Sequence, residues 1–513
     1  METSRRRFLQ NCGLAMLAFG AGKECCAKEK AGNPNILMIV SEDNGPELSC
    51  YGEPYVKTPV LDKLAANGVR FENAFVPYSV CSPSRGCFLT GQWPQQNGQI
   101  GLATHNFAFF NPEVPHMSTL LKKQGYRTAM LGKLHVNPED AFKWDYRKIP
   151  GANFNRANMQ DYSKYAAEFF SQGDEPFFLS INYPDAHYPL HRNKFKDGYG
   201  WPAKPLEAKD VKPLKWIGAD SEHLRDYTAQ YYNCMNRLDT LVGDLLIELE
   251  KSGKADNTMI IYFGDHGAQF SRGKCSVYEA SLRVPLIVSW PGMTKKGYVA
   301  RELVSTLDLL PTMMMASGGA QSKSFAGKPL QPLLAGKADK DFNEYFYGFT
   351  TGASPNLMTV QYSVRDIRYK LICTPQNNKF PTVLSEAYAN RLNAHFAGGT
   401  SKEEIDASGD KAKEIYNVYA YPPKYELYDL RNDPCEFDNL ADNKKYAEVK
   451  VKLIKALAAH QEKIDDQTRH PEKLQAYLDE QAKYYEIMKA GKSSPHRKRG
   501  FRWGYLDYLD PKK

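Results

Sequence analysis

The chain has 513 residues, of which 42% are hydrophobic and 25% are charged. A chain of this length and composition can bury a large core, which excludes an intrinsically disordered or low-complexity protein. The formal net charge is +8, and it falls to about +5 without residues 1–30, which carry six basic and three acidic side chains. A mildly basic balance suits an anionic partner better than a cationic one.

The N-terminus has the pattern of an export signal. Arginines occupy residues 5–7, and an apolar run follows over residues 12–22 that is too short to span a membrane as a helix. This pattern resembles a twin-arginine signal, so residues 1–30 are expected to direct export to the periplasm or out of the cell. Lipoprotein anchoring at Cys25 or Cys26 is a weaker alternative, because charged residues precede both, and a merely basic, frayed terminus is another. No later stretch is apolar and long enough for a transmembrane helix.

Polar residues follow four predicted strands at the point where each strand ends. The apolar run at residues 35–40 is continuous, as in a strand buried on both faces of a parallel sheet, and it leads into Glu42 and Asp43. The same pattern recurs at residues 128–132 before Lys133 and His135, at 176–182 before Asp185 and His187, and at 259–264 before Asp265 and His266. A single such cluster is usually a solvated strand end. Four of them predict one shared site, because ligands of an open α/β sheet bind at the carboxyl ends of its strands.

Helices are predicted between these strands, and a different pattern follows them. Apolar residues at helical spacing predict helices over residues 58–68, 117–125, 221–249 and 303–316. Shorter strand-like runs near the C-terminus then predict an antiparallel sheet, with later helices at 446–460 and from Pro471; the runs are 359–364, 369–372 and 425–430. The tail at 496–503 mixes cations with aromatic residues and is interpreted as a solvated tail, with contact to an anionic polymer as the alternative.

These patterns together predict an α/β fold with a mostly parallel sheet flanked by helices, and a smaller C-terminal α+β domain that contains an antiparallel sheet. The predicted divisions are an export signal over residues 1–30, a catalytic domain over 31–340 and a C-terminal subdomain over 341–513 with a basic, helical tail.

The reactive centre is predicted at Cys81. Pro83 has a fixed φ and suits the first turn of a helix, so Cys81 is expected just ahead of a helix N-terminus, where free N–H groups favour an anion. Arg85, one turn into the helix, adds a fixed positive charge that can fork onto oxyanions. For a lone cysteine, a buried structural residue would be the preferred interpretation.

The motif is longer than a lone cysteine. Cys81, Pro83, Ser84 and Arg85, followed by residues 89–91 (Leu-Thr-Gly), resemble the signature of the type I sulfatases. Further resemblance covers nearly all of the chain after the signal and is nearest to the sulfamidases; the segments are 96–98, 132–139, 176–187, 265–267, 274–285 and 426–440. The resemblance implies an alkaline-phosphatase-like fold, conversion of Cys81 to formylglycine by a maturation enzyme, and a bound Ca²⁺ ion.

The resemblance also implies roles for individual residues. The implied metal ligands are Glu42, Asp43, Asp265, His266 and the modified Cys81. The cation they would hold is needed because the negative charge of a sulfate group repels a nucleophile. Glu42 stands where the family more often has Asp, and His266 where many members have Asn. The implied catalytic residues are Cys81, Arg85, Lys133, His135, His187 and Lys274: the lysines neutralise sulfate oxygens, His135 helps to release sulfate, and His187 protonates the leaving group. His105 and Asn106 are expected to contact the sugar.

The hypothesis from the sequence is an exported sulfatase that hydrolyses sulfate groups from a sulfated oligo- or polysaccharide such as heparan sulfate. N-sulfate and O-sulfate both stay open, because Lys274 and the run after it look like those of O-sulfatases. One alternative is a phosphomonoester or phosphodiester hydrolase of the same superfamily, and another is a non-catalytic glycan-binding relative. Neither a nucleic-acid partner nor an integral membrane segment is expected.

Overall fold

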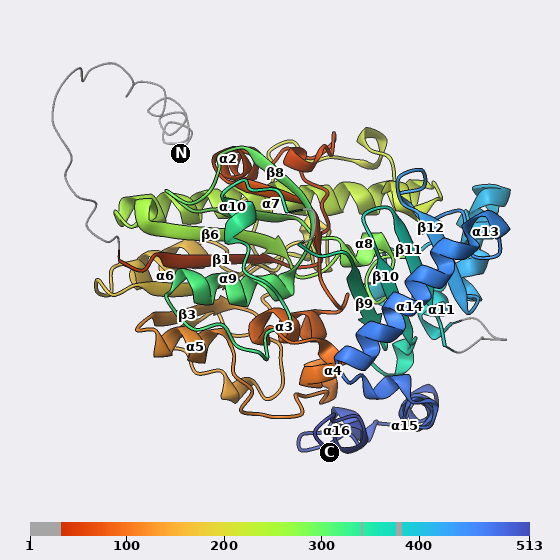
Figure 1. The fold of residues 1–513 in the computed structure, drawn as a ribbon. Helices are drawn as coiled ribbons and strands as arrows, with labels where there is room; N and C mark the ends of the chain where they lie inside the picture. The colour runs from red at the N-terminus through yellow and green to blue at the C-terminus, as the bar shows by residue number, and fades with distance from the viewer. Residues whose placement is uncertain (1–31, 340–341, 376–381) are drawn as a thin grey trace. The chain divides into compact units, whose positions relative to one another are not determined.

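The protein is built around an eight-stranded sheet, seen in the computed structural model that describes residues 32–339, 342–375 and 382–513 (Figure 1). The predicted export signal lies outside the described residues, and Pro34–Lys513 form one compact unit. The strand order is β4-β3-β5-β1-β6-β7-β2-β8, and among these strands β7 alone runs antiparallel to its neighbours. The strands are β1 (Asn35–Ser41), β2 (Val69–Phe75), β3 (Arg127–Gly132), β4 (Tyr146–Lys148), β5 (Phe177–Asn182), β6 (Thr258–Gly264), β7 (Leu286–Ser289) and β8 (Tyr298–Ser305).

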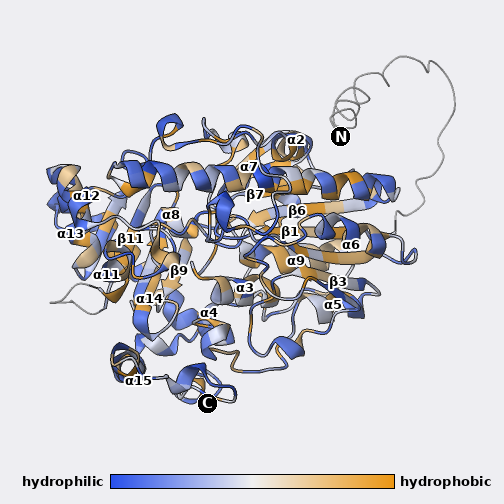
Figure 2. Cartoon of the chain, turned by 180° about the vertical axis from the view of Figure 1, so that it is seen from behind, coloured by the Kyte–Doolittle hydropathy of each residue, from blue (hydrophilic) through white to orange (hydrophobic). Residues whose placement is uncertain are grey.

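The central strand β1 is buried on both faces. Leu37 and Ile39 belong to one hydrophobic cluster, whereas Ile36, Met38 and Val40 belong to another, as the two-residue period of a strand requires. Figure 2 shows the strands of this sheet as largely hydrophobic, with hydrophilic residues on the outer helices. The continuous apolar run in the sequence is therefore explained by burial from both sides.

Helices cover the two faces of this sheet (Figure 1). Those that contribute to the Leu37 side are α2 (Pro59–Asn67), α6 (Asp161–Phe170) and α7 (Glu222–Lys251). Those that contribute to the Ile36 side are α3 (Cys81–Thr90), α5 (Met117–Lys123), α9 (Leu309–Ala316) and α10 (Gln331–Leu334), and the short α4 (Pro94–Asn97) follows α3. The hydroxyl of Ser221 caps α7 by accepting a hydrogen bond from the Leu224 N–H at 3.1 Å. The helices predicted at 58–68, 117–125 and 221–249 are thus confirmed within a few residues.

The helix predicted over residues 303–316 is wrong in its first half. Leu303 belongs to the end of β8, and α9 begins only at Leu309. The Asp308 carboxylate accepts a hydrogen bond from the Ser305 N–H at 2.7 Å, and the Ser305 hydroxyl accepts one from the Leu307 N–H at 3.2 Å. These caps stop the strand and start a short turn before the helix, which the apolar spacing alone did not reveal.

A second, four-stranded antiparallel sheet follows, as the sequence predicted. Its order is β12-β11-β10-β9, from β9 (Phe346–Thr350), β10 (Gln361–Arg365), β11 (Tyr369–Cys373) and β12 (Tyr425–Asp429). The helices around it are α8 (Glu279–Leu282), α11 (Val383–Ala389), α12 (Lys402–Ala407), α13 (Asp410–Ala420), α14 (Ala447–Lys463), α15 (Pro471–Lys489) and α16 (Tyr505–Tyr508). No helix in the described part of the chain is long and apolar enough to cross a membrane. The division at residues 340 and 341 stays a prediction.

The C-terminal segment is packed against the molecule, so the prediction of a solvated tail is wrong. His496 and Trp503 are fully buried, and the Trp503 indole N–H donates to the His105 carbonyl at 2.9 Å. Trp503 also stacks on Phe107, with ring centroids 4.7 Å apart. The aromatic residues in the tail are there to pack, while the cations between them remain at the surface.

Candidate active site

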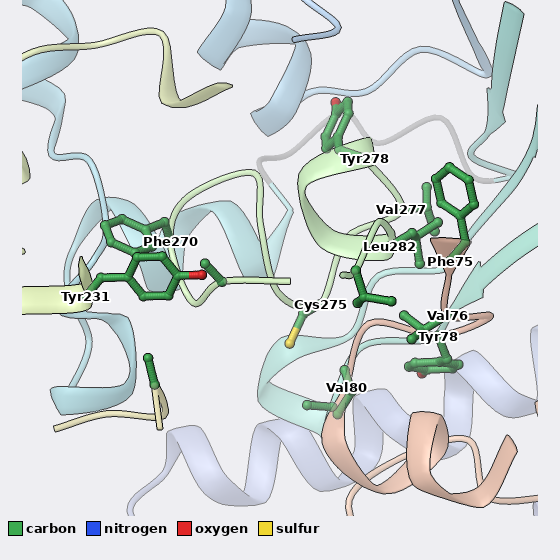
Figure 3. Packing of buried hydrophobic residues seen from close by; sticks show 14 of the residues in the cluster. Phe75, Val76, Tyr78, Val80, Tyr231, Phe270, Cys275, Val277, Tyr278 and Leu282 are labelled. Carbon is green, nitrogen blue, oxygen red and sulfur yellow. The ribbon is translucent and has the colours of Figure 1, made fainter. Parts of the chain in front are cut away.

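Cys81 is the first residue of α3, and its side chain is buried. The preceding residue Val80 is extended, and its carbonyl accepts the Ser84 N–H at 2.9 Å to open the helix. Val80 lies in a buried hydrophobic cluster with Tyr78 and Cys275, which fixes the entry into the helix (Figure 3). The helix begins at Cys81, one residue earlier than the sequence predicted. The unpaired N–H groups and the positive dipole end of the helix favour negative charge beside Cys81.

Arg85 connects the ends of four neighbouring strands. Its side chain is buried, and the guanidinium donates to Glu42 after β1 at 2.7 Å and to Asp265 after β6 at 3.0 Å. It also donates to the Asn182 side chain at the end of β5 at 2.7 Å and to the Lys133 carbonyl after β3 at 3.0 Å. The parallel strand ends that the sequence analysis identified therefore meet at one guanidinium.

The two lysines each pair with a different acid. Lys133 forms an ion pair with Glu42, and Lys274 donates to both carboxylate oxygens of Asp43 at 2.8 and 3.0 Å. Burial opposes the charge on Glu42, yet Lys133 and Arg85 hold its pKa well below the usual range. Burial likewise opposes the charge on Lys274, and Asp43 raises its pKa well above the usual value. Lys274 is thus held in its charged form within a buried site.

The backbone at the end of β3 brings Lys133 into the site. Gly132 has φ +86°, and a Cβ atom there would lie 2.3 Å from the Asn182 carbonyl oxygen. A side chain at this position would push β3 away from β5, so only glycine allows the close approach.

Asp43, Asp265 and His266 converge on Cys81. The His266 Nε2 atom lies 3.2 Å from an Asp43 oxygen, 3.8 Å from an Asp265 oxygen and 3.4 Å from the Cys81 sulfur. Its Nδ1 faces the Gly267 carbonyl at 2.9 Å. Burial lowers the pKa of His266, but Asp265 and Asp43 outweigh burial and raise it to about 9. Burial raises the pKa of the Cys81 thiol, and Lys133 and Lys274 more than offset this and lower it.

Donor atoms suitable for a cation lie close together here. Those of Glu42, Asp43, Cys81 and His187 are all within 4.8 Å of one another, and so are those of Cys81, Asp265 and His266. Carboxylate oxygens are the ligands that Ca²⁺ prefers, and Asp43, Asp265 and His266 bring two carboxylates and one ring nitrogen together beside Cys81. The residues present therefore fit a divalent cation beside Cys81.

Two histidines border the same site. His187 stacks on Phe154 with ring centroids 3.8 Å apart and an interplanar angle of 5°, and its Nδ1 faces the Tyr188 carbonyl at 2.9 Å. Within the described residues, neither ring nitrogen of the half-buried His135 has a hydrogen-bond partner, although both nitrogens are themselves buried. Burial, reinforced by the nearby lysines, lowers the pKa of both histidines well below the usual value. Both rings are therefore neutral and can accept a proton or a hydrogen bond.

Sequence reasoning missed the residues that hold the His187 loop. Asp185 accepts from Arg237 at 2.8 Å and from Arg156 at 3.0 Å, and all three side chains are fully buried. Arg156 also donates to the His187 carbonyl at 2.6 Å. The two arginines lie outside the strand-end pattern, at positions 156 and 237, so no local signal marked them; Asn182 could have been found as the polar last residue of an apolar strand.

His105 and Asn106 lie against the C-terminal segment. The Asn106 amide donates to the carbonyls of His496 and Lys498 at 2.8 and 3.1 Å, and both His105 ring nitrogens face groups of the same segment. Their predicted contact with a sugar stays a prediction.

The fold of this chain is similar to those of several solved structures. The chain aligns with the structure of an enzyme in complex with its substrate D-glucosamine-2-N,6-O-disulfate, with a TM-score of 0.63, 20% identity and coverage of 84% of this chain and 98% of the other. It aligns similarly with a phosphonate monoester hydrolase of Agrobacterium radiobacter, with a TM-score of 0.61, 18% identity and coverage of 84% and 96%. The mostly parallel sheet and the charged cluster at its carboxyl edge thus define an alkaline-phosphatase-like α/β enzyme.

The chain belongs to the sulfatase family, whose model matches residues 34–319. A second model, N-sulphoglucosamine sulphohydrolase, C-terminal, matches residues 264–384. The chain is 31% identical over 432 residues to an ulvan-active sulfatase of Formosa agariphila, covering 82% of this chain and 78% of that protein. It is 29% identical over 477 residues to the human N-sulphoglucosamine sulphohydrolase, covering 84% and 90%. The sequence-based assignment to a sulfamidase-like sulfatase, a sulfuric ester hydrolase, is confirmed.

Proposed function

We propose that the protein is an exported sulfatase that removes sulfate groups from a sulfated glycan through a formylglycine made from Cys81. The observation that carries the proposal is the placement of Cys81 at a helix N-terminus, with its thiol pKa lowered by Lys133 and Lys274 and Arg85 held rigidly beside it. Sulfate is an anion that resists attack by another anion, so a nucleophile needs a strongly cationic setting. Relatives named for glucosamine and ulvan substrates support a glycan as the substrate class.

The side chains have distinct roles in this proposal. Formylglycine at residue 81 would supply, as its hydrate, one hydroxyl as the nucleophile for sulfur and a second for the release of sulfate. Lys133 and Lys274 bind the sulfate oxygens and neutralise the charge that develops on them. His187, held against Phe154 and neutral in the substrate-free site, would protonate the leaving oxygen or nitrogen after the negative charge of a bound sulfate has favoured its protonated form. His135, whose ring nitrogens lack partners among the described residues, would take up the proton of the second hydroxyl.

A Ca²⁺ ion would be held by Asp43, Asp265 and His266, and it would supply charge neutralisation for the sulfate group and the nucleophile. Glu42 is the least secure ligand, because Arg85 and Lys133 occupy its two oxygens. We infer that Glu42 acts mainly by orienting these two cations, which keeps Arg85 and Lys133 aimed at the substrate side of the site.

Sulfate release tests the proposal. The wild-type protein and a Cys81→Ala variant, both produced together with a formylglycine-generating enzyme, are given defined heparin oligosaccharides carrying N- or O-sulfate, and free sulfate is measured. We expect release by the wild type and none by the variant, with thermal unfolding showing that both are folded. Equal release by the two proteins would contradict the proposal.

A phosphoester or phosphonate hydrolase is the second candidate, favoured by the fold shared with a phosphonate monoester hydrolase. Cys81 within the sequence Cys-Ser-Pro-Ser-Arg supports the sulfatase instead. The ratio of kcat/KM values for aryl sulfate and aryl phosphate distinguishes them, and a ratio well below one would favour the second candidate.

A further inference from the structure

The C-terminal segment places one arginine, Arg497, against His105. An Nη2 atom of Arg497 donates to His105 Nε2 at 3.3 Å, and His105 Nδ1 faces His496 Nε2 at 3.0 Å. Since a guanidinium can only donate, a neutral His105 carries its proton on Nδ1 and donates a hydrogen bond to His496 Nε2. The Nδ1–H of His496 then donates to the Ser494 hydroxyl at 2.5 Å. This chain of hydrogen bonds from Arg497 to Ser494, called the relay below, joins both histidines in their neutral forms and holds the Arg497 side chain against His105.

The relay is attached to the catalytic helix. His105 ends a short turn, η2 (Ala103–His105), and the first residue of that turn donates its N–H to the Ser82 hydroxyl at 3.0 Å. Ser82 directly follows Cys81. His105 is itself buried, and burial followed by the charge of Arg497 lowers the pKa of its imidazole to about 3. His105 and Arg497, which lie 392 positions apart in the chain, are thereby linked to the residue that follows Cys81.

His395 borders the site from another segment. It lies in η10 (Ala394–Phe396), with its ring 5.9 Å from that of His187 and 3.8 Å from that of Tyr188. Burial lowers the pKa of His395 to about 4, and the charges of Lys274, Lys133 and Arg497 act in the same direction. The field that His395 experiences therefore comes from the catalytic lysines and from Arg497 together.

Arg497 differs from the other cations of the site in what it contacts. Arg85, Lys133 and Lys274 are buried and paired with carboxylates, whereas Arg497 is exposed and, within residues 32–339, 342–375 and 382–513, forms no ion pair. A guanidinium carries five N–H donors, and His105 takes one of them. An arginine that is held in place but keeps its fork free is suited to bind an incoming oxyanion bidentately.

We propose that Arg497, together with His395, recognises a second anionic group on the saccharide, a carboxylate or a further sulfate, while the first sulfate occupies the site at Cys81. This inference rests on the proposed sulfatase function. Arg497 binds the anion, and the neutral His395 hydrogen-bonds a sugar hydroxyl between the two anionic groups. The protein is then selective for saccharides that carry two negative groups.

The test measures kcat and KM for wild-type, Arg497→Ala, Arg497→Lys and Arg499→Ala enzymes. Arg499 is the matched control, because it is an exposed arginine of the same segment. Four substrates are compared: an aryl sulfate, a singly sulfated glucosamine, a disulfated glucosamine and a sulfated glucosamine linked to a uronic acid. The last two separate a second sulfate from a carboxylate as the recognised group.

We expect Arg497→Ala to raise KM roughly ten- to a hundredfold for one or both of the doubly anionic saccharides, since a lost hydrogen bond to a charged group has an effect of this size. Turnover of the aryl sulfate should stay within about twofold, which also shows that the variant is folded. The KM of Arg497→Lys for these saccharides should lie between those of the wild type and Arg497→Ala, and the KM of Arg499→Ala should match that of the wild type.

Loss in Arg497→Ala that is equal for all four substrates, or equal to that of Arg499→Ala, would overturn the inference. A wild-type enzyme that releases no sulfate from any substrate would contradict the proposed function itself, which separates the two failures.

Discussion

Two of the buried charge clusters in the described part of the chain differ in what their charges face. The catalytic cluster, at the carboxyl edge of the large sheet, consists of Glu42, Asp43, Arg85, Lys133, Asp265 and Lys274. The joint cluster, between α8 and the antiparallel sheet, consists of Glu279, Arg365, Lys370 and Glu436. In the joint cluster, Glu279 pairs with Arg365 at 2.5 Å and with Lys370 at 3.2 Å, and Lys370 reaches Glu436 at 2.9 Å.

The joint cluster is closed by its own members. Glu436 also accepts the Glu279 N–H at 2.6 Å, so the acids and bases serve one another. The catalytic cluster surrounds a thiol and lies beside His135, whose ring nitrogens lack partners among the described residues. Buried ion pairs cost desolvation energy in both places. We infer from this difference that the chemistry belongs to the cluster with polar groups available for a ligand, whereas the closed cluster holds two parts of the fold together.

The largest expected effect is on stability, from opening the joint cluster. Lys370→Met removes the cation that Glu279 and Glu436 share, and leaving buried carboxylates without it should lower the free energy of unfolding by about 3–5 kcal/mol. Chemical denaturation measures this change. The exposed Lys411→Met is the control and should shift stability far less, because surface ion pairs contribute little. A Lys370→Met enzyme of normal stability but strongly reduced kcat would break the comparison.

The next largest effect is on turnover, from the catalytic cluster. Lys133→Ala leaves Glu42 paired with Arg85, so the fold should change little in stability. Loss of one preorganised charge at the sulfate oxygens should reduce kcat about a hundred- to a thousandfold. Steady-state kinetics on an aryl sulfate measures it, with the exposed Lys143→Ala as control. A variant that unfolds readily but turns over normally would assign Lys133 a structural role instead.

The smallest effect is a pH dependence of the joint cluster. Burial raises the pKa of Glu436 to about 7, although Lys370 opposes this shift. A carboxyl whose pKa is higher in the folded state than in the unfolded state stabilises the protein at low pH and loses this contribution as pH rises from about 4.5 to 7. Stability should therefore fall by about 2–3 kcal/mol between pH 5 and 8 through this group.

The Glu436→Gln variant isolates that contribution. Its amide oxygen can still accept the Glu279 N–H, but the side chain no longer titrates. Denaturation at several pH values should give a flatter profile than that of the wild type. Identical profiles would show that Glu436 ionises normally.

Much of the fold could be predicted from local patterns of apolar and polar residues in the sequence. A strand buried on both faces must be continuously apolar, and the polar residues where such strands end must lie at one edge, so Glu42, Lys133, His187 and Asp265 could be grouped from the sequence. The helix predicted from Leu303 was wrong in its first half because side-chain caps at Ser305 and Asp308, rather than apolar spacing, decide where the helix starts.

Contacts between distant segments could not be predicted in the same way. Arg237 lies on the buried face of α7, where the sequence shows one cation among core residues and gives no hint of its partner Asp185. The tail looked solvated because its cations are adjacent in sequence, whereas Trp503 determines its path by packing against Phe107. Pairings of this kind depend on the assembled fold.

The most direct test of the central claim is the mass of the peptide that contains Cys81, taken from enzyme that releases sulfate. Conversion of the thiol to formylglycine makes this peptide about 18 Da lighter, and the account predicts that the converted fraction rises in proportion to specific activity across preparations. Fully active enzyme in which Cys81 is an unmodified thiol would contradict it.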